Sequence, residues 1–230
     1  RADAFVGELY LDIDMSDLQE FTNLIGSPAA LDVEGALQAE VWLDWDRGES
    51  TVALKMQGHD LSFFGEDRAW KLPADLISLQ ASLVERSDHW TVFISDFKFY
   101  KDDIDLRLPR LQIDNWGDSL RLRAESVPLA PVNELLVDLS LTPDAVADVF
   151  DVLNARGKLS ALQIDVADVG APLDDWQFSA NFQQLEVESW RGAPGVSSAK
   201  GYVELAKEGG FVALDSQSFA MDFPTVYKEP

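Results

Sequence analysis

The stretch GALQAEVWLDWD, Gly35–Asp46, decides the fold class of this chain. Every second residue in it is apolar: Leu37, Ala39, Val41, Leu43 and Trp45. A period of two is typical of a β-strand with one buried face. The next four residues, 47–50, have the composition of a hairpin turn, and beyond them Val52, Leu54 and Met56 alternate with polar residues. This stretch therefore predicts two antiparallel strands joined by a short turn.

The same alternation recurs along most of the chain. It is found at Leu79–Leu83, Trp90–Ile94, Ile104–Leu108, Leu120–Leu122 and Trp176–Phe182. Between Phe93 and Phe99 the apolar residues change parity, which predicts either a β-bulge or a strand that is apolar on both faces. A last strand-like run, 211–223, is expected to break near Ser216.

Helical patterns are few. Ser16–Leu24 has a capping box and an exit glycine, and a second helical region is expected around the Thr142-Pro143 pair. The chain is accordingly divided into a preceding strand and short helix (1–26), an antiparallel β block (27–127), a helical insert (128–156) and a second β block (157–230). Both β blocks open alike, at Gly35-Ala36-Leu37 and Gly157-Lys158-Leu159, which indicates a weak internal repeat.

The predicted fold class is mainly β with a small helical insert. The sheet is expected to be either an elongated, curled, groove-like antiparallel sheet or a two-layer β-sandwich. Alternation alone does not separate these two, because a groove and a sandwich core both need one apolar face.

Charge and composition exclude several functional classes. The net charge is -23, so the surface would repel the phosphates of nucleic acids and an anionic membrane. The absence of cysteine removes disulfides, thiol nucleophiles and thiolate metal sites. No apolar run approaches the ~18 residues of a transmembrane helix. Because the chain opens at Arg1 with no signal peptide and closes at Pro230, we expect a segment of a longer protein.

The sequence offers no catalytic constellation. His59 and His89 are thirty residues apart and fit no zinc-binding motif, and no GxSxG, GxGxxG or P-loop pattern is present. Acidic pairs are what 41 Asp and Glu residues produce by chance, and the seven scattered tryptophans favour core packing over a sugar-stacking platform. We therefore expect no catalytic residue, no metal and no cofactor, and a protein that is not an enzyme.

One segment carries a family resemblance. It runs from Val187 to Gly201 and contains Trp190, Gly192, Pro194 and Gly195. This spacing resembles the W-x-G-x-P-G stretch of YhdP-type members of the AsmA-like family. Residues 127–132 and 155–159 are similar to that family's helical insert and its P-x-G-x-L exit, although Ala155 stands where the family has proline.

The resemblance implies a location and a role. Such proteins are anchored in the inner membrane of Gram-negative bacteria and have long periplasmic bodies with an apolar groove associated with phospholipid movement and outer-membrane homeostasis. The implied partners are phospholipid and neighbouring modules of the same full-length chain, and nucleic acid is not among them. The matching residues are structural glycines, prolines and aromatics, so no active site is carried over.

Three hypotheses follow for function. The first is a periplasmic segment that provides an apolar β-groove for phospholipid passage. The second is a non-catalytic structural or protein-interaction β-sandwich, and the third is a glycan-binding or glycan-cleaving domain, which a row of exposed tryptophans beside carboxylates would favour. For the first, the expected lipid-contacting residues are the best alternating positions of the longest β block: Leu37, Val41, Leu43, Val52, Leu54, Leu83, Val92, Ile94 and Leu106.

Overall fold

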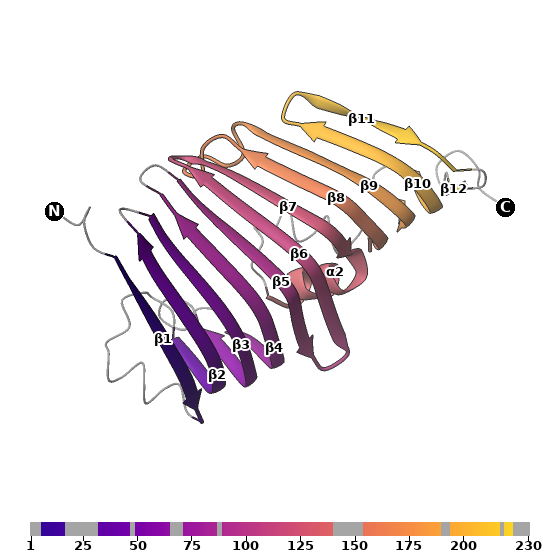
Figure 1. Ribbon diagram of the computed structural model, residues 1–230. Coiled ribbons are helices and arrows are strands. Elements are labelled where there is room, and N and C mark those ends of the chain that lie inside the picture. The colour runs from indigo at the N-terminus through magenta and orange to yellow at the C-terminus, as the bar shows by residue number, and fades with distance from the viewer. Residues whose placement is uncertain are drawn as a thin grey trace. The chain divides into compact units, whose positions relative to one another are not determined.

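The computed structural model describes residues 6–16, 32–46, 49–64, 71–86, 89–139, 154–189, 194–216 and 219–222. The chain divides into two compact units, Arg1–Leu120 and Arg121–Pro230. Each unit is built on antiparallel strands that pair with their neighbours in the sequence (Figure 1). Each unit is described by itself below.

The first unit is a curled sheet of six strands in the order β1-β2-β3-β4-β5-β6. Each consecutive pair is antiparallel. The described strands of this unit belong to one sheet, so the prediction of a curled single sheet is confirmed and a two-layer sandwich is not what this unit forms. The strands are β1 (Val6–Met15), β2 (Asp32–Asp46), β3 (Glu49–Phe64), β4 (Lys71–Glu85), β5 (His89–Lys101) and β6 (Ile104–Trp116).

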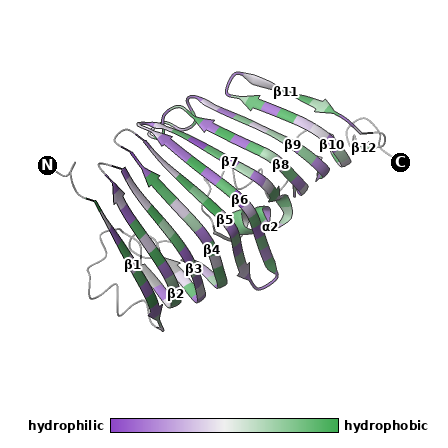
Figure 2. Cartoon of the chain, in the orientation of Figure 1, coloured by the Kyte–Doolittle hydropathy of each residue, from purple (hydrophilic) through white to green (hydrophobic). Residues whose placement is uncertain are grey.

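Alternation along each strand gives this sheet two different faces. Residues that are directly opposite on neighbouring strands share a face. The register pairs Leu43 with Val52, Val52 with Leu83 and Leu83 with Val92, so apolar residues meet apolar residues across four strands. Figure 2 shows the resulting bands of hydrophobic and hydrophilic residues along the strands.

The predicted change of parity in β5 is a β-bulge. The register between β4 and β5 shifts between the Ser78 and Gln80 positions, and Asp96 lies opposite this shift with a φ of 51°. The bulge brings Phe97 and Phe99 back to the apolar face, since they pair with Leu108 and Leu106. The alternative of a strand apolar on both faces is therefore not needed.

The second unit contains five strands in the order β7-β8-β9-β10-β11, and a short β12 pairs with β10. The last apolar run splits after Leu214 into β11 and β12, which confirms the predicted break near Ser216. The elements are β7 (Ser119–Pro128), α2 (Leu129–Leu139), β8 (Arg156–Val166), β9 (Trp176–Val187), β10 (Gly195–Ala206), β11 (Gly209–Leu214) and β12 (Ala220–Asp222).

Helix is confined to α2 within the described residues. It begins directly after Pro128 and lies in the stretch predicted as a helical insert. The expected helix at Ser16–Leu24 and the region around Thr142-Pro143 lie outside the described residues, apart from Ser16 itself. Gly157, the first residue of the expected second β block, lies in strand β8.

The same backbone arrangement occurs near the start of the β block in each unit. Gly35 and Gly157 have φ values of 120° and 109°, a region that favours glycine. Each faces a left-handed residue on the next strand: a Cβ on Gly35 would lie 2.6 Å from the carbonyl oxygen of Asp60, and one on Gly157 would lie 2.4 Å from that of Gln184. The shared arrangement agrees with the internal repeat indicated by the sequence.

Candidate functional site

The apolar face of the first unit gathers all nine residues that the sequence singled out. The register arranges this face in cross-strand rows that run perpendicular to β2–β6. Three of these rows contain the nine residues. They are Leu37–Gly58–Ile77–Phe99–Leu106, Val41–Leu54–Ala81–Ile94–Leu111 and Leu43–Val52–Leu83–Val92–Ile113.

Exposure differs from row to row. In the first row Ile77, Phe99 and Leu106 are buried, and the Leu106 side chain is 4% exposed. In the other two rows every residue is half-buried rather than buried. The sheet therefore has a closed apolar end at the Leu37 row and a partly open apolar surface at the Val41 and Leu43 rows.

Sequence reasoning missed the residues that complete these rows. Ala81, Leu111 and Ile113 fill the gaps between predicted positions, and Leu9 and Leu11 on β1 extend the two open rows by one strand. Leu9 and Leu11 are exposed. The signal that would have found Leu9 and Leu11 is the same alternation, which holds in β1. In β6 the apolar positions change parity after Leu108, and Leu111 and Ile113 follow the parity change of their partners on β5.

The second unit has an apolar face of its own. Its register aligns apolar residues across β8–β11, with Phe182 and Ala180 buried at the centre. Toward the edge strand β11 the face opens, and Val212 is 58% exposed. The aligned sets are Leu159–Phe182–Gly201–Leu214, Ile164–Phe178–Leu205 and Ala180–Val203–Val212.

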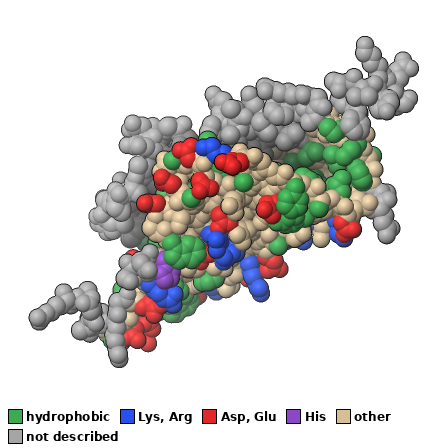
Figure 3. Space-filling view, turned by 90° about the horizontal axis from the view of Figure 1, so that it is seen from above, with side chains coloured by type: hydrophobic (Ala, Val, Ile, Leu, Met, Phe, Trp, Pro, Cys, Tyr) green, Lys and Arg blue, Asp and Glu red, His purple; other side chains and the backbone are tan. Residues whose placement is uncertain are grey.

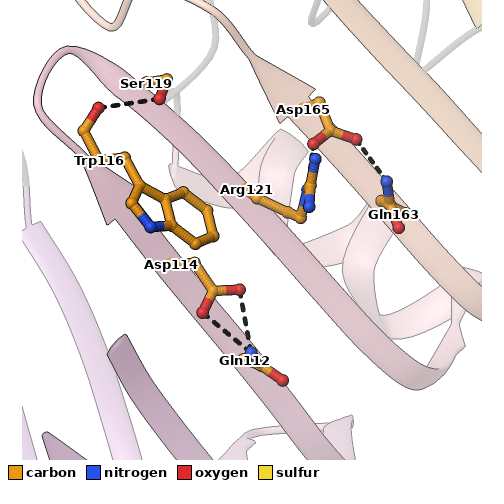
Figure 4. A network of polar contacts seen from close by, with 7 residues as sticks. All are labelled: Gln112, Asp114, Trp116, Ser119, Arg121, Gln163 and Asp165. Atoms are coloured by element: carbon orange, nitrogen blue, oxygen red, sulfur yellow. Dashed lines mark hydrogen bonds and ion pairs between the residues drawn. The ribbon is translucent and has the colours of Figure 1, made fainter. Parts of the chain in front are cut away.

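The opposite face of the sheet in each unit is polar, and side chains on it are joined to one another by hydrogen bonds. In the first unit the buried Asp114 carboxylate accepts hydrogen bonds from the Gln112 amide (2.9 and 3.0 Å) and the Thr91 hydroxyl (3.0 Å). In the second unit, Asp165 pairs with Arg121 and accepts a hydrogen bond from Gln163 (2.6 Å). Figure 4 shows Asp114 with Gln112, and Asp165 with Arg121 and Gln163. Figure 3 shows charged side chains on the surface among separate hydrophobic patches.

Replacing Asp114 by alanine is expected to lower the free energy of unfolding by about 1–3 kcal/mol. The reason is that the Thr91 hydroxyl and the Gln112 amide lose their acceptor in a place that water reaches poorly. Urea unfolding of Asp114→Ala beside Asp118→Ala, a change at an exposed turn residue, measures the difference. Equal midpoints for the two variants would contradict the structural role given to Asp114.

The histidines and acidic residues that the structure describes do not gather into a metal site. In that part of the chain, no group of three or more His, Cys, Asp or Glu side chains could hold a metal ion. His59 hydrogen-bonds Gln57 at 2.9 Å, and the His89 ring stacks on Trp116 with centroids 6.4 Å apart. Among the described helices, none is both long and apolar enough to span a membrane.

Comparison with known proteins then identifies the family. The family model described as YhdP protein matches residues 3–230, almost the whole chain. The chain belongs to the YhdP family. A similar curated protein is the "Intermembrane phospholipid transporter YhdP" of Escherichia coli (strain K12), which is 24% identical over 245 residues. The match covers 97% of this chain but 18% of that relative, so this YhdP-family chain spans about a fifth of the relative's length. No solved structure matches the chain.

Proposed function

We propose that this YhdP-family chain is a segment of a lipid-transport and outer-membrane-homeostasis protein, and that its apolar sheet face provides a groove for phospholipid passage. The proposal places the segment in the periplasm of a Gram-negative bacterium, as part of an inner-membrane-anchored protein. Its partners are phospholipid and the neighbouring modules of the full-length chain. A role in passage requires no catalytic residue.

The observation that carries the proposal is the pair of half-buried apolar rows on the first unit. The Val41 row and the Leu43 row each cross β2–β6 without a polar residue. With strands about 4.8 Å apart, each row is roughly 19 Å long. A continuous apolar surface that stays partly open is unusual on a folded protein and typically marks a binding site.

Acyl chains fit this surface on energetic grounds. Each methylene that leaves water for an apolar surface contributes about 0.8 kcal/mol, so several methylenes along one row give useful affinity without any directional contact. Such binding is non-directional, and a chain can slide from one row to the next. Sliding is what a passage requires, because tight binding at a fixed point would stop movement.

The polar face supports the same reading. Adjacent residues in a strand point to opposite faces, so Ala53 faces away from Leu54 and Ser82 faces away from Leu83. Acidic residues concentrate on the polar face of β1 and β2: Glu8, Asp12, Asp14, Glu40, Asp44 and Asp46. One face can therefore hold apolar ligand while the other stays hydrated.

The test uses this alternation as its control. A photo-crosslinking amino acid is placed at Leu54 in one variant and at Ala53 in another, and each protein is irradiated with phosphatidylethanolamine–phosphatidylglycerol vesicles. Mass spectrometry is expected to find phospholipid attached at position 54 and not at position 53. Equal labelling at both positions, or none at either, would overturn the proposal.

A matched pair of substitutions gives the affinity. Leu54→Asp is expected to reduce bound phospholipid by at least about tenfold, since an unpaired carboxylate on the apolar face adds more than about 1.4 kcal/mol to the cost of seating an acyl chain. Ala53→Asp puts the same charge on the polar face and is expected to leave binding unchanged. Circular dichroism confirms that both variants keep their strand content.

A further inference from the structure

An aromatic pair stands on the polar face of the first unit. Tyr10 on β1 and Trp42 on β2 are register partners, and their ring centroids are 5.4 Å apart. Both side chains are well exposed, Tyr10 by 51% and Trp42 by 43%. Rings that pack in a core lose most of their exposure, so this pair presents a stacking surface to solvent rather than sealing the sheet.

A polar hollow of about 500 Å³ begins at Asp12 and Glu40, the next polar-face positions along β1 and β2 after this pair. It crosses β1–β5, and its walls on the polar face include Asp12, Glu40, Lys55, Gln57 and Lys98. Asp12 and Glu40 lie two residues along their strands from Tyr10 and Trp42, on the same face. The pKa of Tyr10 is raised by partial burial and by these two carboxylates, which agrees with their closeness to its hydroxyl.

The side chains around the hollow offer hydrogen-bond donors and acceptors in mixture. Carboxylates accept, ammonium groups donate, and the amide of Gln57 does both. Four carboxylates line the hollow, those of Asp12, Asp14, Glu40 and Asp96, beside the ammonium groups of Lys55 and Lys98. Lys55 and Glu40 form an ion pair at 3.5 Å. A polyhydroxylated ligand can donate to the carboxylates and accept from the lysines. Hydroxyl groups suit such a lining best, because each both donates and accepts.

We propose that the polar face binds a saccharide, with a sugar ring stacked on Tyr10 and Trp42 and the next residues of the glycan hydrogen-bonded in the adjoining hollow. A sugar ring has an apolar C–H surface that matches an aromatic face, and its rim of hydroxyls matches the hollow. The site lies on the face opposite the apolar rows. It is thus separate from the proposed lipid surface, and either proposal can fail alone.

The second unit repeats the arrangement. On its polar face Tyr202 and Phe211 have ring centroids 5.7 Å apart. A hollow of about 340 Å³ beside them is lined by Ser160, Asn181 and Lys200 among others, and by Tyr202 itself. Among the described residues, each unit therefore has a tyrosine-containing aromatic pair near a polar hollow.

The experiment titrates the intact chain with chitohexaose, maltohexaose and cellohexaose, followed by NMR of the tryptophan indole N–H groups and by calorimetry. At least one hexasaccharide is expected to shift the Trp42 indole signal, which is assigned with a Trp42→Phe variant. Trp42→Ala and Gln57→Ala are each expected to weaken binding about tenfold, equivalent to about 1.4 kcal/mol. Trp116→Ala removes an equally exposed tryptophan at the far end of β6 and is expected to change nothing.

Three outcomes would overturn the proposal. The first is that no hexasaccharide moves the Trp42 signal. The second is that saccharide binding persists unchanged in both Trp42→Ala and Gln57→Ala. The third is that hexalysine binds with the same dependence on Trp42 while no saccharide does, which would make the surface a docking site for cationic protein segments. Because Gln57→Ala leaves the aromatic pair intact, it decides the matter even if Trp42→Ala perturbs folding.

Discussion

Replacing Gly201 by valine is expected to lower the free energy of unfolding by about 3 kcal/mol or more. A Cβ at this position would lie 2.0 Å from the backbone carbonyl oxygen of Ala213 and 2.7 Å from Cζ of Phe182. The Phe182 ring is 2% exposed and packs over the space that the glycine leaves open, so it has no room to retreat. Overpacking against backbone is costly because the strand itself must move.

Urea unfolding of Gly201→Val measures this effect, with Gly170→Ala as the control in the same unit. A Cβ on Gly170 would meet the Asp168 carboxylate at 3.1 Å, which is a flexible side chain in an exposed turn, and the expected change is small. Gly201→Val/Phe182→Leu removes the ring contact but not the Ala213 contact, so it should recover only part of the loss. If the double variant recovers the full stability, or if Gly201→Val alone is as stable as Gly170→Ala, then strand β11 can move away from the added side chain at little cost and the prediction is wrong.

The same glycine explains part of the sequence resemblance. Gly201 is the last residue of the Val187–Gly201 segment that carries the resemblance, and Gly195 is the last glycine of its W-x-G-x-P-G pattern. A Cβ on Gly195 would lie 3.0 Å from the amide nitrogen of Ser189. Both glycines occupy β10, where neighbouring chain approaches closely. These two glycines of the segment therefore serve the close packing of the strand.

Alternation predicted which side of the central strands is apolar, although it left out Ala81, Leu111 and Ile113 and the β1 residues Leu9 and Leu11. A period of two determines which residues share a face, and a hairpin turn sets the register between strands. For this reason Leu37, Val41 and Leu54 could be assigned to one surface from sequence. Whether that surface is a closed core or an open groove depends on what packs against it, and alternation contains no information on that point.

The polar face was harder to predict for a physical reason. Tyr10 and Trp42 are separated by a stretch that includes a chain reversal, and only the β1–β2 register brings their rings together. Trp42 was assigned to packing because tryptophan usually is buried, yet it occupies a polar-face position in the alternation. An aromatic residue on the wrong parity of a strand is the signal that would have marked it.

Neighbouring residues of strand β2 lie on opposite faces of the sheet and belong to two different proposed binding surfaces. Trp42 and Leu43 are adjacent on β2, yet Trp42 belongs to the aromatic pair on the polar face and Leu43 lies in an apolar row. A single-layer sheet permits this because, among the described strands of the first unit, no second sheet packs on either face. The separation of apolar and polar residues onto two faces depends on the strand register, since a slip by one residue would exchange the faces. The bulge and glycine positions that fix register are therefore where the fold is most sensitive.

Gly157→Ala tests that sensitivity and is expected to cost about 2–3 kcal/mol of unfolding free energy. Gly157 has a φ of 109°, and a Cβ there would lie 2.4 Å from the carbonyl oxygen of Gln184, which itself has a φ of 50°. Alanine must leave this backbone region and push the opposing bulge. We expect Gly35→Ala to behave alike in the first unit, because the Asp60 carbonyl stands in the same place.

Gly117→Ala separates the two causes of this loss. Gly117 has a φ of 59° but nothing within 4 Å of a Cβ, so alanine there suffers only the backbone cost of about 1 kcal/mol. If urea unfolding shows Gly157→Ala to be as mild as Gly117→Ala, the Gln184 bulge is free to rearrange and does not fix register. If the loss is two to three times larger, the glycine and the bulge together fix the register, and the same close approach of Gly35 to the Asp60 carbonyl predicts the same behaviour in the first unit.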